Sequence, residues 1–154
     1  MNDQRPAILL DEGFARWRWT RGYVENVAAA IVLAVADEHA TGRIYNVGEP
    51  ETLSMAEWAR EVGKAAGWNG EVIVLPKDRL PAHMVMDSGA NQDILVDSTR
   101  IRKELGYREP VPMDEALRRT IAWERANPPE KIDSRMYDYD AEDAVLAELK
   151  KQTG

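Results

Sequence analysis

The chain has no cysteine among its 154 residues. This excludes disulfides and thiolate metal ligands, and it weakly favours a reducing compartment. A basic excess is also missing, because 27 acidic residues outnumber 20 basic ones and leave a net charge of -7. Proteins that grip duplex nucleic acid usually carry the opposite balance. The composition therefore argues against a nucleic-acid partner, while it leaves room for a small local anion site.

Long apolar runs are also scarce. The longest, residues 27–36, falls far short of the roughly 20 residues that a membrane helix needs. The first residues, MNDQRPAILLDEG, lack the basic region, apolar core and cleavage site of a secretory signal. We therefore expect a soluble, cytoplasmic protein without a membrane partner.

Familiar catalytic patterns are missing as well. The two histidines, His39 and His83, have no partner at metal-ligand spacing. The chain has no Gly-x-Ser-x-Gly elbow and no phosphate-binding loop. Asp87 and Asp93 flank a long loop, but acids in loops are usually only solvated. We predict no catalytic residue and no metal site in this chain.

Helical and strand patterns alternate along the sequence, which predicts an α/β fold. Short strands are predicted at residues 8–10, 43–47 and 71–75. Helices are predicted at about residues 27–36, 54–66, 98–105 and 112–126, and a weakly amphipathic helix is predicted after the acidic stretch 137–143, ending at Lys151. We divide the chain into one domain over residues 1–129 and an acidic C-terminal tail with a short helix over residues 130–154.

Two of the predicted helices have contrasting patterns. Ser54 and Glu57 have the spacing of a capping box at the start of the helix over 54–66. The helix over 27–36, for which Asn26 is a candidate N-cap, is apolar nearly all round. Such a helix should be buried on more than one side.

Residues 16–21, RWRWTR, place arginines and tryptophans directly before that apolar helix. Their alternation is expected of a half-buried strand that turns its arginines outward. The same side chains would also suit an anion site for one small ligand. Both interpretations stay open, whereas the acidic net charge disfavours nucleic acid.

Three segments resemble the later half of extended short-chain dehydrogenases/reductases, the NAD-dependent epimerase/dehydratase family. They are TRGYVENVAAAIVLAV, then GRIYNVGEPETLSMAEWAREVGKAAG, then DSTRIRKELGYREPVPMDEALRRTIAW. In that family the first opens a buried helix, the second joins a Tyr-Asn-Val-Gly strand end to a Ser-capped helix, and the third is a closing signature. The resemblance covers about residues 18–127. It implies a partial α/β architecture of helices with a few short strands.

Two features of that family have no counterpart here. The Gly-x-x-Gly-x-x-Gly turn that meets the cofactor pyrophosphate is missing. The catalytic Tyr-x-x-x-Lys is missing too, because the fourth residue after each of the five tyrosines is never lysine. The resemblance therefore implies the C-terminal, substrate-side part of such an enzyme, without the N-terminal Rossmann dinucleotide-binding half. We predict that this chain alone binds no cofactor, whereas the intact enzyme uses NAD or NADP.

A further difference concerns the substrate. Family members that act on nucleotide sugars have an arginine seven residues before the helix-opening acid, and Trp19 stands at that position. A second family arginine has no counterpart in residues 88–93, so a diphosphate would lack cationic partners. A less charged sugar or polyol is favoured. The predicted substrate contacts are Arg18, Arg21, Tyr23, Asn91 and Gln92, with a plain loop as the alternative for the last two.

Two functions are compatible with these observations. The first is the substrate-binding portion of an NAD(P)-dependent sugar or polyol epimerase, dehydratase or reductase that is inactive as an isolated chain. The alternative is a stand-alone small-molecule-binding or protein-interaction module that lacks the cofactor lobe. A missing lobe would expose an apolar surface, so we also predict self-association through the apolar face around Ile31.

Overall fold

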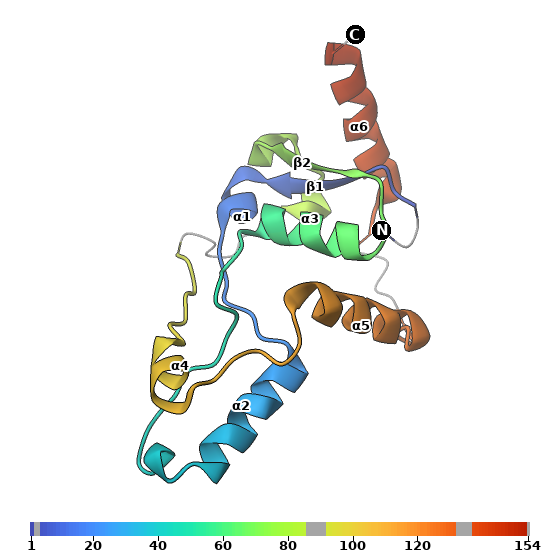
Figure 1. The fold of residues 1–154 in the computed structure, drawn as a ribbon. Coiled ribbons are helices and arrows are strands. Elements are labelled where there is room, and N and C mark those ends of the chain that lie inside the picture. Colours follow the sequence, from blue (N-terminus) through green and yellow to red (C-terminus); the bar gives the residue numbers. More distant parts are fainter. Residues whose placement is uncertain (2–3, 86–91, 132–136, 154) are drawn as a thin grey trace.

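A computed structural model describes residues 1, 4–85, 92–131 and 137–153 (Figure 1). Among them the helices are α1 (Glu12–Arg16), α2 (Val24–Ala36), α3 (Met55–Ala65), α4 (Thr99–Leu105), α5 (Met113–Ala126) and α6 (Tyr139–Thr153). Two strands, β1 (Ala7–Asp11) and β2 (Glu71–Leu75), form a parallel sheet, and three short 3-10 turns cover Glu38–Ala40, Lys77–Arg79 and Ala82–Met84. The α/β class and the partial architecture of helices with few strands are confirmed.

The sheet pairs two segments for which the sequence predicts strands. Ala7 lies opposite Glu71 and Asp11 opposite Leu75. One face of the sheet is covered by α6, which places Leu146 in a buried cluster with Leu9 and Leu75. Figure 1 shows α1 and α3 close to the sheet and α6 rising beyond it. The helix of the acidic tail is therefore part of this core, and the proposed division at residue 129 stays a prediction.

A second buried cluster lies around α2 and α4. Ala30 from α2 packs against Ile101 and Leu105 from α4, and Tyr107 completes the group. Gly106 ends α4 in the left-handed conformation, with φ of 66°, which glycine adopts without the steric cost that a side chain adds. This cluster lies at the opposite end of the molecule from the sheet (Figure 1).

The predictions for α2 were partly wrong. The helix begins at Val24, with Tyr23 as its N-cap, so Asn26 lies inside it. The Asn26 side chain donates to the carbonyl of Val111 at 2.9 Å and accepts from the Val111 N–H at 3.0 Å. Burial on more than one side is not found either, because only Asn26 and Ala30 of α2 are buried.

The predicted strand over 43–47 is absent from the described fold. No backbone N–H of residues 44–47 hydrogen-bonds to another described residue. A strand needs a neighbour that completes its ladder, and the sheet of β1 and β2 lies elsewhere. The strand pattern is thus present without a pairing partner.

The helix α3 agrees with its sequence signals. Ser54 accepts from the backbone N–H of Glu57, and the Glu57 carboxylate accepts from the backbone N–H of Ser54 at 2.8 Å. The capping box is therefore confirmed, and it fixes the start of the helix that carries Trp58. The contacts of α3 with α5 place these two helices side by side, above the segment that enters α2.

Candidate functional site

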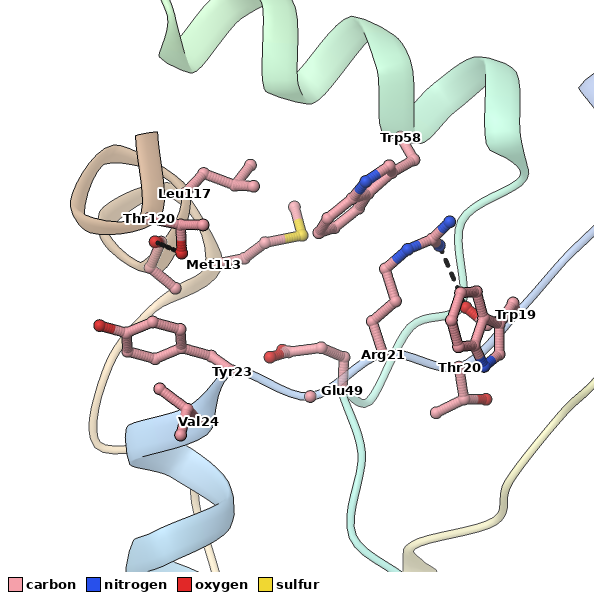
Figure 2. A pocket seen from close by; sticks show the side chains of 12 residues that line it. Trp19, Thr20, Arg21, Tyr23, Val24, Glu49, Trp58, Met113, Leu117 and Thr120 are labelled. Atoms are coloured by element: carbon pink, nitrogen blue, oxygen red, sulfur yellow. Dashed lines mark hydrogen bonds between the residues drawn. The ribbon is translucent and has the colours of Figure 1, made fainter. Parts of the chain in front are cut away.

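A cavity of about 560 Å³ opens between the segment before α2, the loop after residue 48, α3 and α5 (Figure 2). Its wall is mainly apolar, with a few charged and polar groups, as small-molecule sites usually are. The lining residues are Trp19, Thr20, Arg21, Gly22, Tyr23, Val24, Glu49, Trp58, Met113, Ala116, Leu117 and Thr120. We take it as the candidate site.

The cation of the cavity is Arg21. Its guanidinium lies over the Trp58 ring, 4.3 Å from the centroid, and 5.7 Å from the centroid of Trp19. It donates to the carbonyl of Trp19 at 3.1 Å and approaches the sulfur of Met55 at 2.7 Å. Partial burial lowers the pKa of this guanidinium from its ordinary value. Within the described part of the chain, no carboxylate forms an ion pair with Arg21, so its charge has no internal anion to balance it.

The carboxylate of the cavity belongs to Glu49. Its backbone N–H donates to the carbonyl of Arg21 at 2.7 Å, which joins the two segments that carry the charged groups. Burial raises the pKa of the Glu49 carboxyl, and the nearby charge of Glu109 raises it further. The backbone N–H of Tyr23 and the side chain of Asn26 donate to this carboxyl and oppose the rise.

Tyr23 forms one side of the cavity and is held by surface charges. Its hydroxyl donates to Glu25 at 2.6 Å, and Arg119 from α5 donates to the other oxygen of Glu25 at 2.9 Å. The hydrogen bond to Glu25 is the main reason why the pKa of the Tyr23 phenol is raised. These contacts orient the ring between α2 and α5, with the hydroxyl engaged at its outer end.

A polar network that is only partly buried at Arg102 and Glu109 is joined to the loop of Glu49. Arg102 makes a bidentate ion pair with Glu109 and donates to the carbonyl of Gly48 at 3.0 Å. The hydroxyl of Tyr107 donates to the carbonyl of Asn26 at 3.0 Å. Since Gly48 directly precedes Glu49, the network fixes the backbone from which that carboxyl projects.

Comparisons with known proteins find relatives that are named as sugar dehydratases. It is 34% identical over 90 residues to a dTDP-glucose 4,6-dehydratase of Streptomyces griseus, a match covering 58% of this chain and 25% of that protein. It is 30% identical over 125 residues to the dTDP-glucose 4,6-dehydratase of Streptomyces niveus, covering 81% of this chain and 34% of that protein. No family model matches the chain.

Solved structures agree with this relationship. The WbmF enzyme of Bordetella bronchiseptica, in complex with NAD+ and UDP, is 28% identical with a TM-score of 0.53, covering 75% of this chain and 32% of WbmF. The epimerase Mth375 of Methanothermobacter thermautotrophicus is 21% identical with a TM-score of 0.58, covering 81% and 34%. The chain is a relative of the extended short-chain dehydrogenases/reductases. It spans between 25% and 37% of the length of the curated relatives it matches.

The predicted substrate contacts lie in different places in the structure. Arg21 and Tyr23 line the cavity, as does Trp19 at the position where family members carry arginine. Arg18 and Gln92 lie outside it: the Arg18 backbone N–H donates to Asp93 at 2.9 Å, and the Gln92 carbonyl accepts from the Trp17 indole at 2.8 Å. Asn91 falls outside the described residues. A substrate role for these residues stays a prediction.

The segment RWRWTR also has some of the strand pairing that its alternating pattern predicts. Arg18 forms an isolated antiparallel bridge with Ser54, and Trp19 forms a parallel one with Ile94. The segment is therefore bridged on both sides while it contributes Trp19 and Arg21 to the cavity. Strand pairing and a ligand-facing side thus coexist here.

Most of the lining residues were not predicted as substrate contacts, and three of them matter for the chemistry of the cavity. Glu49, Trp58 and Met113 come from a loop, α3 and α5, which are far apart in the sequence. Glu49 directly follows the Tyr-Asn-Val-Gly segment, and this position is the signal that could have marked it. For Trp58 and Met113 the sequence shows only amphipathic helices.

Clusters of metal ligands and membrane spans are both missing from the described residues. No group of three or more histidine, aspartate or glutamate side chains in them is arranged to hold a metal ion. None of their helices has the length and apolarity to cross a lipid bilayer.

Proposed function

We propose that this chain is the substrate-binding portion of an NAD(P)-dependent sugar or polyol epimerase, dehydratase or reductase. The observation that carries the proposal is the cavity around Arg21, whose cation lacks an internal anionic partner among the described residues. Its apolar wall and its few polar groups suit a hydroxylated small molecule. The relatives named for dTDP-glucose dehydration support the sugar class.

In this proposal the chain itself does not hold the cofactor. A dinucleotide needs free backbone N–H groups at a turn between a strand and a helix. Among the described residues, one strand of the sheet leads directly into an α-helix. This is β1, which ends at Asp11, where α1 begins. There the Asp11 carboxylate already accepts from the N–H groups of Gly13 and Phe14 at 2.9 Å each. An anionic side chain occupies the place of a phosphate, so these residues do not fit NAD.

The proposal is tested by ligand titration with calorimetry. UDP-glucose, dTDP-glucose, UDP-glucuronate, free glucose and xylitol represent the substrate class, and NAD and NADP represent the cofactor. We expect saturable binding of at least one member of the first group and no micromolar binding of either cofactor. Tight cofactor binding, or failure of every sugar and polyol, would overturn the proposal.

Arg21→Ala locates the binding site. We expect it to weaken the binding of an anionic sugar about tenfold or more, since a charge-assisted hydrogen bond contributes roughly 1.5–3 kcal/mol. Arg108→Ala is the matched control, because Arg108 is exposed and does not line the cavity. Circular dichroism would show that both variants remain folded, and loss of folding in Arg21→Ala would instead favour a structural role for the arginine.

A stand-alone interaction module is the second candidate, and one observation favours it. The outer face of α2 exposes Val24, Ile31, Val32 and Val35, with exposed fractions from 58% to 83%. In an intact enzyme a cofactor lobe would cover this face, whereas the isolated chain would self-associate through it. An in-frame glycine-rich turn and Tyr-x-x-x-Lys in the upstream coding DNA would favour the enzyme portion over the module. The cytoplasmic location and the absence of a nucleic-acid partner stay predictions.

A further inference from the structure

The cavity carries a cation and an anion that do not neutralise each other. The backbones of Arg21 and Glu49 are joined by a hydrogen bond of 2.7 Å, yet no ion pair connects the two side chains among the described contacts. Figure 2 shows the reason: the guanidinium points toward Trp58, and the carboxylate points toward Tyr23. A ligand can therefore meet both groups without first breaking an internal salt bridge.

Glu49 has acceptor capacity to spare. An ionised carboxylate accepts up to about four hydrogen bonds and donates none. The nearby protein donors are the Tyr23 backbone and the Asn26 side chain, whose amide also donates to the Val111 carbonyl, so the carboxylate keeps acceptor capacity for a ligand. Arg102 is the nearby cation, but it is engaged in its bidentate pair with Glu109. A partly buried carboxylate in these surroundings is stabilised by further donors, and hydroxyl groups of a ligand are suitable ones.

Arg21 has the complementary surplus. A guanidinium has five N–H donors, and within the described part of the chain it donates to two protein acceptors, the Trp19 carbonyl and the Met55 sulfur. Stacking on Trp58 holds its plane in position, which suits it to a planar or tetrahedral oxyanion. On the α5 side of the cavity, Met113 and Leu117 offer apolar surface for the C–H face of a sugar ring (Figure 2).

We infer that Glu49 and Arg21 act together as the specificity-determining pair of this cavity, for a hydroxylated ligand that carries one anionic group. Hydroxyl groups donate to Glu49, and a carboxylate or phosphate accepts from Arg21. This inference rests on the proposed function, because it concerns the same cavity. It narrows the substrate class from sugars and polyols in general to acidic ones.

The test uses ligands that separate the two interactions. Glucose, glucuronate, glucose 6-phosphate and inorganic phosphate are titrated into the full chain by ligand-observed NMR. We expect glucuronate or glucose 6-phosphate to bind about tenfold or more tightly than glucose, and the comparison of these two identifies carboxylate or phosphate as the anion. Arg21→Gln should remove this preference for an acidic sugar.

Glu49→Gln tests the other half of the pair. It should weaken the acidic sugar about tenfold, because one charged acceptor becomes a neutral amide, and it should leave inorganic phosphate unchanged. Glu51→Gln, an exposed acid two positions further along the same loop, is the control and should alter neither.

The outcomes separate the inference from the proposed function. Equal binding of glucose and the acidic sugars, or an unchanged affinity in Glu49→Gln, would overturn the inference and leave the proposed function standing. Binding of a UDP-sugar without binding of any of these monosaccharides would also overturn the inference and leave the proposed function standing. If neither they nor any ligand of the substrate panel binds, both fail.

Discussion

The region around the sheet buries its apolar side chains, whereas the region around α2 leaves several of them exposed. In the first, Leu9 is only 1% exposed and α6 closes the sheet with Leu146. In the second, Val35 of α2 is 83% exposed and nearby Ile44 is 82% exposed. Both regions contain well-formed helices, so the difference does not lie in helix formation. It lies in whether a distant part of the chain arrives to cover the helix.

Two kinds of partner are missing from the α2 region of the described chain. The apolar face of α2 lacks a packing partner, and the N–H groups of residues 44–47 lack a neighbouring strand. A cofactor lobe with a sheet and a packing face would supply both. The unpaired N–H groups of residues 44–47 therefore support the proposal that the chain functions as one part of a larger enzyme, whereas the exposed face of α2 fits both candidate functions.

The largest expected effect is a core substitution in the closed region. Leu9→Ala should lower the free energy of unfolding by about 2–5 kcal/mol, because it removes buried methyl groups and leaves a cavity. Val35→Ala on the exposed face should change it by no more than about 0.5 kcal/mol. Urea denaturation measures both, and equal effects would contradict the contrast between the regions.

Asn26→Ala should have the next largest effect, because Asn26 ties α2 to the rest of the chain. The variant leaves the buried N–H and C=O of Val111 without partners, which costs about 2–4 kcal/mol of unfolding free energy. Asn46→Ala is the control, since Asn46 is exposed and makes only a long bond of 3.4 Å. A small loss in Asn26→Ala would mean that α2 is held by its apolar contacts alone.

Glu49→Gln should have a smaller effect that depends on pH. Burial raises the pKa of Glu49, helped by Glu109 and opposed by Arg102. The raised pKa favours the folded state below the unfolded value of about 4.3, and this contribution is lost as the pH rises through the folded pKa. The variant should therefore be more stable than the wild type at neutral pH, with no advantage at low pH. Urea denaturation across this range measures the difference, and a variant that is less stable at pH 7 would refute it.

The smallest effect on stability, but a clear one on association, is expected from the double variant Val32→Ser, Val35→Ser. Both side chains are exposed, at 67% and 83%, so the free energy of unfolding should change by about 0.5 kcal/mol or less. Sedimentation should nevertheless show a shift from self-associated chains to monomers. Val74→Ser, at an exposed site on β2, serves as the control and should leave association unchanged. A wild-type chain that is already monomeric at high concentration would contradict the proposed association.

Features that depend on local chemistry could be predicted from the sequence. The capping box of Ser54 and Glu57 involves only neighbouring residues. The runs that form β1 and β2 were also identified, although their pairing with each other was not. These elements owe their form to propensities that act over a few residues.

Other features depended on remote contacts and were mispredicted. Asn26 is of a residue type that often caps helices, but its side-chain amide hydrogen-bonds to the backbone of Val111, 85 residues away. Residues 43–47 have a strand-like composition, but no described segment forms a hydrogen-bonded ladder with them. The site divides in the same way: Arg21 and Tyr23 were found from a local motif, whereas Trp58 and Met113 join them only through the packing of α3 on α5.

The closure of the sheet by α6 sets an order for folding during synthesis. Arg5 pairs with Asp143, 138 residues further along, and Leu146 completes the cluster that Leu9 begins. One face of β1 therefore stays uncovered until α6, which lies far along the chain from it, has left the ribosome. Translation that stops before α6 would release a sheet with its apolar side open, which is the kind of surface that chaperones bind and that drives aggregation.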